Sequence, residues 1–236
     1  SKELGLDTKV LIVGAGPGLS ASLARLFAAQ GMKVALTARD TGKLADLAGE
    51  IDAVTVACDV GDAESIESMW AAVKAEIGVP DVVVYNPSYR VRGPFIELDQ
   101  DEVKKAILIT CYSGFLVAQT AAKDMVERGS GSIQFTGASA SIKGYPQSAS
   151  FAMGKFGLRG LAQSMARELA PQNIHIAHFV IDGGISSPRN ASRAEGKPAD
   201  SLLEPDAIAQ SYLDTHRQHR SAWTWEVELR PWVEKF

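Results

Sequence analysis

Short apolar runs alternate with segments of helical periodicity along most of this chain. Residues 9–13 (KVLIV) run into a glycine-rich turn, as a strand buried on both faces of a sheet commonly does. In residues 20–30 the apolar positions recur at helical spacing, and Gly31 is suited to end that helix. The pattern predicts further strands at residues 33–37, 54–57, 81–85, 132–136, 174–180 and 224–229. It predicts further helices at residues 41–50, 63–77, 99–109, 110–128, 148–169 and 206–219.

Repeated strand–helix units force a parallel sheet with right-handed crossovers and helices on both faces. We therefore expect an α/β protein, a single-domain doubly wound Rossmann fold over residues 1–236 with a parallel sheet of about seven strands. Residues 186–204 break the pattern, because they are polar and contain Pro188, Gly196 and Pro198. We expect a mobile loop there, bordering the substrate and carrying at most a short helix.

Composition and charge exclude several classes of protein. The formal net charge of −4 makes the chain repel phosphate backbones and anionic lipid, so we expect no nucleic-acid and no membrane partner. No apolar run reaches the roughly 18 residues of a membrane span, and residues 1–4 lack the apolar core of a signal peptide. Cys58 and Cys111 are too few for a disulfide framework and are expected to be buried. These features predict a cytoplasmic protein.

Histidines offer no convincing metal site. His216 and His219 are three residues apart on a predicted helix, but no carboxylate or cysteine cluster accompanies them. We therefore expect no metal, and ordinary packing or hydrogen bonding for His175 and His178.

A glycine-rich turn lies directly between the first strand and the first helix. Glycines permit a tight turn and let backbone N–H groups approach a diphosphate, and the helix start adds partial positive charge. Leu19 occupies the last position of the usual G-x-G-x-x-G spacing. The setting nevertheless predicts a dinucleotide site. The residues expected to contact the cofactor here are Gly14, Gly16, Pro17, Gly18 and Leu19.

The end of the second strand indicates which dinucleotide is bound. An acidic residue there would hold a ribose 2′-hydroxyl, whereas an arginine accommodates a 2′-phosphate. Ala38 stands at the expected position of the acid, and Arg39 follows it. We therefore predict NADP, with NAD less favoured, although an ordinary surface arginine and the neighbouring Asp40 leave the alternative open.

With these motifs the chain resembles the short-chain dehydrogenase/reductase family over about residues 9–187. Gly14 and Gly18 resemble the family's glycine motif, with Ser20 in place of its last glycine. The resemblance implies adenine contacts from Asp59 and Val60 and cofactor contacts from Asn86 and Pro87. It also implies a ribose contact from Lys155 on the active-site helix. Nicotinamide contacts are implied for Gly183 and Ile185, in a segment that lacks the family's proline.

The departures from the family concern its catalytic residues. The position of the family's general-acid tyrosine, four residues before Lys155, holds Phe151. Its serine position falls on Ala138, with Ser139 adjacent, and its asparagine position on Thr110. Because phenylalanine has no exchangeable proton, ordinary carbonyl reduction should lose roughly two to four orders of magnitude in rate.

Two functional interpretations follow. In the first, the protein is an NADP(H)-dependent oxidoreductase acting on a small carbonyl or alcohol, with another proton donor. Tyr145 is the best candidate for that donor, Tyr89 and Tyr112 are further ones, and Ser139 could polarise the substrate oxygen. In the second, the protein is a catalytically impaired NADP-binding sensor or partner subunit. Family membership favours the first interpretation only by analogy.

The resemblance also implies assembly and a substrate pocket. Family members often form dimers or tetramers through two long helices, which here are residues 110–128 and 148–169, so we expect a homodimer or homotetramer. The second helix is rich in small residues that allow close approach, including Gly154, Gly157 and Gly160. We expect Phe95, Tyr145 and Pro146 to help shape a partly apolar pocket. The aromatic C-terminal segment, including Trp223, Trp225, Trp232 and Phe236, is expected to pack against the core or another subunit.

Overall fold

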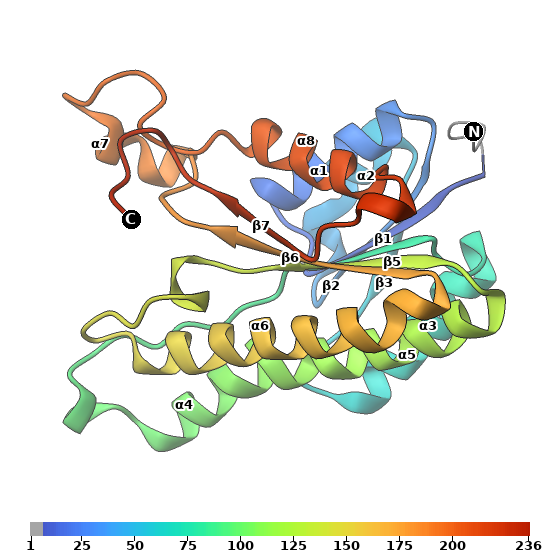
Figure 1. The fold of residues 1–236 in the computed structure, drawn as a ribbon, viewed down its shortest axis with the longest axis horizontal. Coiled ribbons are helices and arrows are strands. Elements are labelled where there is room, and N and C mark those ends of the chain that lie inside the picture. The colour runs from blue at the N-terminus through green and yellow to red at the C-terminus, as the bar shows by residue number, and fades with distance from the viewer. Residues whose placement is uncertain (1–6) are drawn as a thin grey trace.

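A computed structural model describes residues 7–236 of the protein. The N-terminal residues 1–4, from which we argued against a signal peptide, lie outside the described residues. Seven parallel strands form one sheet in the order β3-β2-β1-β4-β5-β6-β7 (Figure 1). They are β1 (Lys9–Val13), β2 (Lys33–Ala38), β3 (Val54–Ala57), β4 (Val82–Tyr85), β5 (Gly131–Thr136), β6 (Ile174–Ile181) and β7 (Glu226–Leu229). The expected sheet is confirmed.

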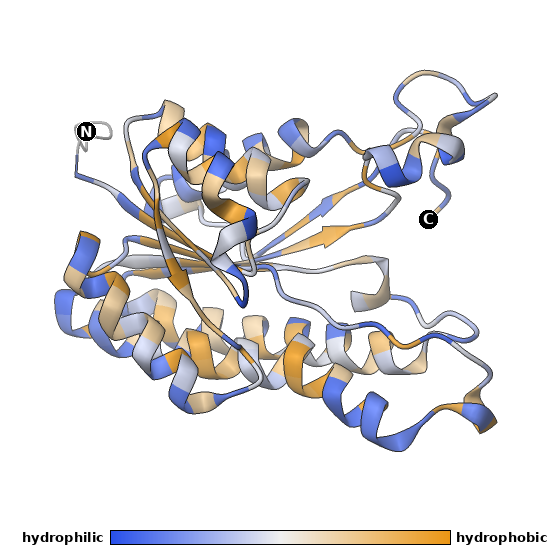
Figure 2. Ribbon diagram, turned by 180° about the vertical axis from the view of Figure 1, so that it is seen from behind, coloured by the Kyte–Doolittle hydropathy of each residue, from blue (hydrophilic) through white to orange (hydrophobic). Residues whose placement is uncertain are grey.

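Helices cover both faces of the sheet. One face carries α1 (Leu19–Ala29), α2 (Ala45–Ile51) and α8 (Pro205–His216), and the other carries α3 (Ala63–Ile77), α4 (Gln100–Ile107), α5 (Ser113–Arg128) and α6 (Ala149–Leu169) (Figure 1). Strand residues alternate between two apolar cores: Leu11 and Val83 face one, whereas Val10 and Ile12 face the other. The central strands β1 and β4 therefore present apolar residues to both faces, while the helices show hydrophilic residues on their outer surfaces (Figure 2).

The helices α4 and α5 run into each other through a π-helical segment, Leu108–Tyr112, rather than as two separate helices. By length and composition alone the combined helix Gln100–Arg128 could cross a membrane. Its residues Val117, Ala121 and Met125 are instead buried in the core beside the sheet. A soluble core helix passes the same composition test, so this feature does not indicate a membrane span.

Several predicted boundaries were wrong near the C-terminus. The last helix ends at His216, and His219 lies beyond it, accepting a hydrogen bond from the backbone N–H of Ser221. The last strand begins at Glu226 because the preceding residues pair with Gln218, whose side-chain oxygen accepts from the Thr224 N–H at 2.8 Å. The two histidines therefore do not share a helical face.

Other burial predictions were only partly met. Cys58 is buried, but Cys111 is only partly buried. Trp223 stacks on His175 with ring centroids 4.5 Å apart, whereas Trp232 and Phe236 are 69% and 90% exposed in this chain. Packing of those two aromatics against the core of their own chain was therefore a wrong expectation.

The segment between β6 and α8 is partly ordered. It contains a 3-10 turn at Pro188–Asn190 and the short helix α7 (Ala191–Ala194). Ile185 and Leu203 form a β-bridge at its base, which fixes both ends of the segment beside the carboxyl end of β6.

Candidate functional site

The glycine-rich turn after β1 is shaped by a close backbone approach. Gly14 has φ +76°, and a Cβ there would lie 2.6 Å from Cγ of Pro87, so only glycine fits. The N–H groups of Gly14 and Ala15 both donate to the Thr37 carbonyl, at 3.1 and 2.8 Å. The turn is thereby fastened to β2 and to the loop after β4.

Beyond that fastening, the turn faces open space. A Cβ added at Gly16 or Gly18 would meet no atom within 4 Å. The start of α1 has no side-chain cap and no acidic residue in its first turn, so its N–H groups are not neutralised by the protein. An uncapped helix start beside an open glycine turn fits a diphosphate. The cradle expected from Gly14, Gly16, Pro17, Gly18 and Leu19 is thus physically suited to a dinucleotide.

A chain of polar side chains holds this turn to the middle of the sheet. Asn86 donates from Nδ2 to Ser20 Oγ at 2.8 Å, and Ser20 donates to the Gly14 carbonyl at 3.2 Å. The Asn86 amide oxygen accepts from the Thr136 hydroxyl, which also pairs with the buried Tyr212 hydroxyl at 2.6 Å. Asn86, expected from sequence to contact the cofactor, therefore positions the turn through Ser20.

The residues expected from the sequence to contact the adenosine lie after β2 and β3. Arg39 is exposed there and has no acidic partner among the ion pairs of residues 7–236. The neighbouring Asp40 uses its carboxylate to accept the Gly42 N–H at 3.0 Å. Asp59 similarly accepts from the Gly61 N–H, and the Val60 carbonyl accepts from the Ser113 hydroxyl. Asp40 and Asp59 are therefore engaged with backbone N–H groups, whereas Arg39 is in no ion pair of the described chain.

Lys155 lies on α6 at the opposite end of the candidate site. Its side chain is 3% exposed, and Nζ donates to the Thr136 carbonyl at 2.7 Å. Burial lowers the pKa of Lys155 to about 8. Phe151 precedes it by one helical turn, with the ring centroid 5.7 Å from Lys155 Nζ. The guanidinium carbon of Arg90 lies 4.6 Å from the same centroid.

The other residues singled out from sequence are spread around this end. Thr110 is fully buried in the π-helical segment, and its hydroxyl oxygen accepts from the Tyr89 N–H at 3.1 Å. Ser139 begins the turn Ser139–Ser141 near Asp182 and helps to lower the pKa of that carboxyl. Tyr89 donates its hydroxyl proton to Glu102 at 2.5 Å, and Tyr112 stacks on Phe115. Tyr145 is 45% exposed.

The segment expected to border the nicotinamide is tightly packed. A Cβ on Gly183 would lie 2.7 Å from Cδ of Pro231. Asp182, which replaces the family's proline, is 1% exposed and pairs with Lys143 at 3.0 Å and Arg230 at 3.3 Å. Burial opposes ionisation of Asp182, but hydrogen bonds from Ser139, Lys143 and Arg230 outweigh it and lower its pKa.

A cavity of about 400 Å³ adjoins this segment, between the chain around α7 and the C-terminal segment. Its lining includes Gly184, Arg193, Lys197 and Leu202. Phe95 and Tyr145, expected to help shape an apolar pocket, do not line it, and Phe95 is 79% exposed. No group of three His, Cys, Asp or Glu side chains able to hold a metal occurs in the part of the chain that the structure describes.

Comparison with known proteins agrees with this geometry. The profile described as short chain dehydrogenase matches residues 8–198. This chain belongs to the short-chain dehydrogenase family. MabA of Mycobacterium tuberculosis, a 3-oxoacyl-(acyl-carrier-protein) reductase, is 31% identical over 182 residues, covering 77% of this chain and 71% of its own. D-threitol dehydrogenase of Mycolicibacterium smegmatis is 31% identical over 225 residues, covering 88% and 85%.

Solved structures of short-chain dehydrogenases superpose over nearly the whole chain. One from Rhodopseudomonas palustris is 35% identical, covers 96% of this chain and 99% of its own, and has a TM-score of 0.82. A metagenomic short-chain oxidoreductase in complex with NADP is 26% identical, covers 97% and 98%, and has a TM-score of 0.83. Oxidoreductase family membership is thus established for this chain.

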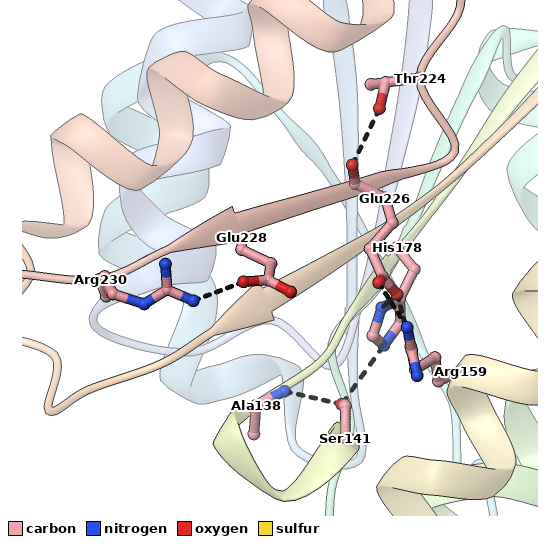
Figure 3. Close-up of polar contacts among 8 residues, drawn as sticks. All are labelled: Ala138, Ser141, Arg159, His178, Thr224, Glu226, Glu228 and Arg230. Atoms are coloured by element: carbon pink, nitrogen blue, oxygen red, sulfur yellow. Dashed lines mark hydrogen bonds and ion pairs between the residues drawn. The ribbon is translucent and has the colours of Figure 1, made fainter. Parts of the chain in front are cut away.

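A buried network behind Ser139 was missed by the sequence analysis. His178 on β6 is fully buried, with Nδ1 3.1 Å from Glu226 Oε2 and Nε2 3.3 Å from Ser141 Oγ (Figure 3). Arg159, on the same helix as Lys155, forms a two-pronged ion pair with Glu226 at 2.7 and 2.8 Å. Ser141 accepts from the Ala138 N–H, so the network joins the Ser139 turn to α6. Its members are too far apart in sequence for spacing to reveal them.

Protonation of this network opposes folding. Burial lowers the pKa of His178 to about 4, against the attraction of Glu226. For Glu226, burial raises the pKa, but Arg159 and His178 outweigh it and lower the pKa overall. Because the folded protein keeps His178 neutral, it binds fewer protons than the unfolded chain between pH 6.5 and 4.

We predict that the His178→Gln variant has weaker acid sensitivity than the natural protein. In the natural protein His178 should lower the unfolding free energy by up to about 1.4 kcal/mol per pH unit as the pH falls from 6.5 towards 4. Urea unfolding of both proteins across this range measures the difference. Parallel pH profiles for the two proteins would contradict the assignment.

We predict an effect of the same sign for Lys155, in a higher pH range. The pKa of Lys155 is depressed in the folded protein, so its contribution to stability rises as the pH increases from about 8 towards 10.5. Relative to Lys155→Met, the natural protein should gain about 1 to 2 kcal/mol in unfolding free energy between pH 7.5 and 9.5. Denaturant unfolding at these two pH values is the measurement, and a pH-independent difference would refute a low pKa for Lys155.

Proposed function

We propose that this protein is an NADP(H)-dependent oxidoreductase that transfers a hydride between the cofactor and a small carbonyl or alcohol. The observation that carries the proposal is the open glycine turn at an uncapped helix start, with buried Lys155 at the other end of the candidate site. Bound NADP(H) would supply or accept the hydride. The glycine turn and the start of α1 would hold its diphosphate, and Lys155 would hold the nicotinamide ribose.

The environment of Arg39 supports NADP over NAD. Arg39 follows β2 directly and is in no ion pair with any residue that the structure describes, while the Asp40 carboxylate caps the following turn rather than standing ready for a ribose hydroxyl. A guanidinium suits a 2′-phosphate because it donates charge-assisted hydrogen bonds. The structural relative in complex with NADP is consistent with this preference.

The substrate end would work without a tyrosine at position 151. Ser139 is the residue that we propose to polarise the substrate oxygen, because its hydroxyl lies beside Asp182 at the carboxyl end of β6. Tyr145 is the proposed proton donor, because its exposed side chain is free to approach a substrate, whereas Tyr89 is engaged with Glu102. Thr110 would support the site structurally by holding the Tyr89 backbone, and the 186–204 segment would border the substrate.

A second candidate function rests on Phe151 itself. The phenyl ring lies beside Lys155 and Arg90, where a tyrosine would present a proton. A protein that binds NADP(H) but lacks this proton could act as a redox-state sensor or as a partner subunit. Turnover distinguishes the two candidates, because a sensor would bind NADPH without oxidising it.

We also propose that the protein is a cytoplasmic homodimer or homotetramer. Its exposed large apolar residues on the two long helices include Tyr112, Phe115, Met153 and Phe156. Gly154 and Gly157 pack within the chain instead, since a Cβ on either would lie 2.9 and 2.8 Å from Thr110 and Cys111 respectively. The apolar side chains, rather than those two glycines, are therefore the basis for assembly.

Arg39→Ala should weaken NADPH binding about tenfold or more and leave NADH binding unchanged, because it removes charge-assisted hydrogen bonds to the 2′-phosphate. Fluorescence titration with both nucleotides gives the ratio. Asp40→Asn is the control: it keeps an acceptor for the Gly42 N–H and should not weaken NADPH. An equal loss for NADH and NADPH in Arg39→Ala would argue against NADP specificity.

NADPH oxidation measured with a panel of ketones and aldehydes tests the proposed activity. Phe151→Tyr should raise kcat by roughly 10²- to 10⁴-fold, because it restores a proton donor one turn before Lys155. Phe151→Leu, which removes the ring without adding a proton, is the matched control and should bring no gain. Tight NADPH binding with no turnover in the natural protein would favour the sensor.

Light scattering should give a mass at least twice the chain's 25.2 kDa. Phe156→Glu should shift the protein towards monomer, because it places a charge in the proposed apolar interface. Val126→Glu is the control, because Val126 is an exposed apolar residue near the end of α5, and this variant should not shift the protein towards monomer. A natural protein that is monomeric at working concentration would disprove the assembly.

A further inference from the structure

Three arginines around the candidate site have no acidic partner. Arg90 and Arg92 lie in the loop after β4, and Arg193 lies on α7. The ion pairs within residues 7–236 involve other bases, and none includes these three. By contrast, Lys143 pairs with Asp182 at the same end of the sheet, and Arg230 pairs with both Asp182 and Glu228.

Arg90 is held in a defined place. Its guanidinium lies 4.6 Å from the centroid of the Phe151 ring, within the range of a cation–π contact, and Nη2 is 3.5 Å from Ser148 Oγ. Phe151 is the ring that Lys155 Nζ also approaches, at 5.7 Å. The Phe151 ring therefore holds the Arg90 guanidinium one helical turn before Lys155.

The other two arginines are, like Arg90, exposed cations. The pKa of Arg90 is lowered, first by burial and then by repulsion from Arg92 and Arg193. Arg193 also lines the cavity beside the nicotinamide segment, with Nη1 3.5 Å from the point that a Gly184 Cβ would occupy. Like charges gathered without a counter-charge repel one another, and an anion relieves that repulsion.

We propose that Arg90, supported by Arg193, binds an anionic oxygen group of the substrate, and that the substrate is a small keto acid or its hydroxy-acid counterpart. This inference rests on the proposed oxidoreductase function. A guanidinium fork matches a carboxylate or a phosphate with two parallel hydrogen bonds. Arg90 and Lys155 both approach the Phe151 ring, so the anionic group would bind close to the reacting carbon of the substrate. In a short keto acid the carboxylate and the ketone carbon are separated by such a small distance.

Calorimetry on the NADPH-loaded protein and on the protein alone tests the proposal without relying on turnover. Acetoacetate is the carboxylate probe, methyl acetoacetate is the neutral probe with the same ketone, and methyl phosphate is the phosphate probe. Acetoacetate should bind at least tenfold more tightly than its ester. Arg90→Gln and Arg193→Gln should each reduce acetoacetate affinity severalfold or more without changing ester binding. Arg167→Gln, an exposed arginine near the other end of α6, should change neither affinity.

The outcomes separate this inference from the proposed function. Binding of methyl phosphate but not acetoacetate would support an anion site at Arg90 but would contradict the keto-acid substrate. Equal affinity for acetoacetate and its ester, no binding of either anion, or an unchanged preference in Arg90→Gln would overturn it. Anion binding without NADPH oxidation would support the anion site and count against the oxidoreductase function. Oxidation of NADPH with neutral ketones but not with keto acids would support the oxidoreductase function and count against the anion site.

Discussion

The hydrogen bonds of Asn86 connect the loops at the carboxyl edge of this sheet. Its amide group joins Ser20, at the start of α1, to Thr136, at the end of β5. Thr136 in turn offers its backbone carbonyl to Lys155. Hydrogen bonds through Asn86 and Thr136 therefore link the glycine turn to the buried lysine, the two ends of the proposed cofactor site.

Local sequence signals identified the fold and the glycine turn because each depends on residues close together in the chain. Residues 9–20 form strand, turn and helix within one short segment, and Gly14 is required there by its own φ angle and its contact with Pro87. The C-terminal part was harder to predict. The polar contacts of Gln218 with the chain around Thr224 delay the last strand, and no periodicity reports such a contact.

The buried network and the arginine cluster were beyond sequence reasoning for the same reason. His178 and Glu226 are 48 residues apart, and they meet only because β6 and β7 pair in parallel with His178 opposite Glu226. Arg90 lies in the loop after β4, whereas Phe151 lies on α6. Sequence could show that Phe151 lacks a proton, but only the structure shows that its ring supports a guanidinium, which turns an apparent loss into a candidate recognition element.

The central claim is that the open turn at Gly16 holds the diphosphate of NADP(H). Calorimetry with NADPH on the natural protein and on Gly16→Ala tests it directly, because an added Cβ meets no protein atom within 4 Å and should leave the melting temperature unchanged. The natural protein should bind NADPH, and the variant should bind at least tenfold more weakly. Absence of heat with NADPH, NADP, NADH and NAD for the folded natural protein, or equal NADPH affinity in the variant, would contradict the account.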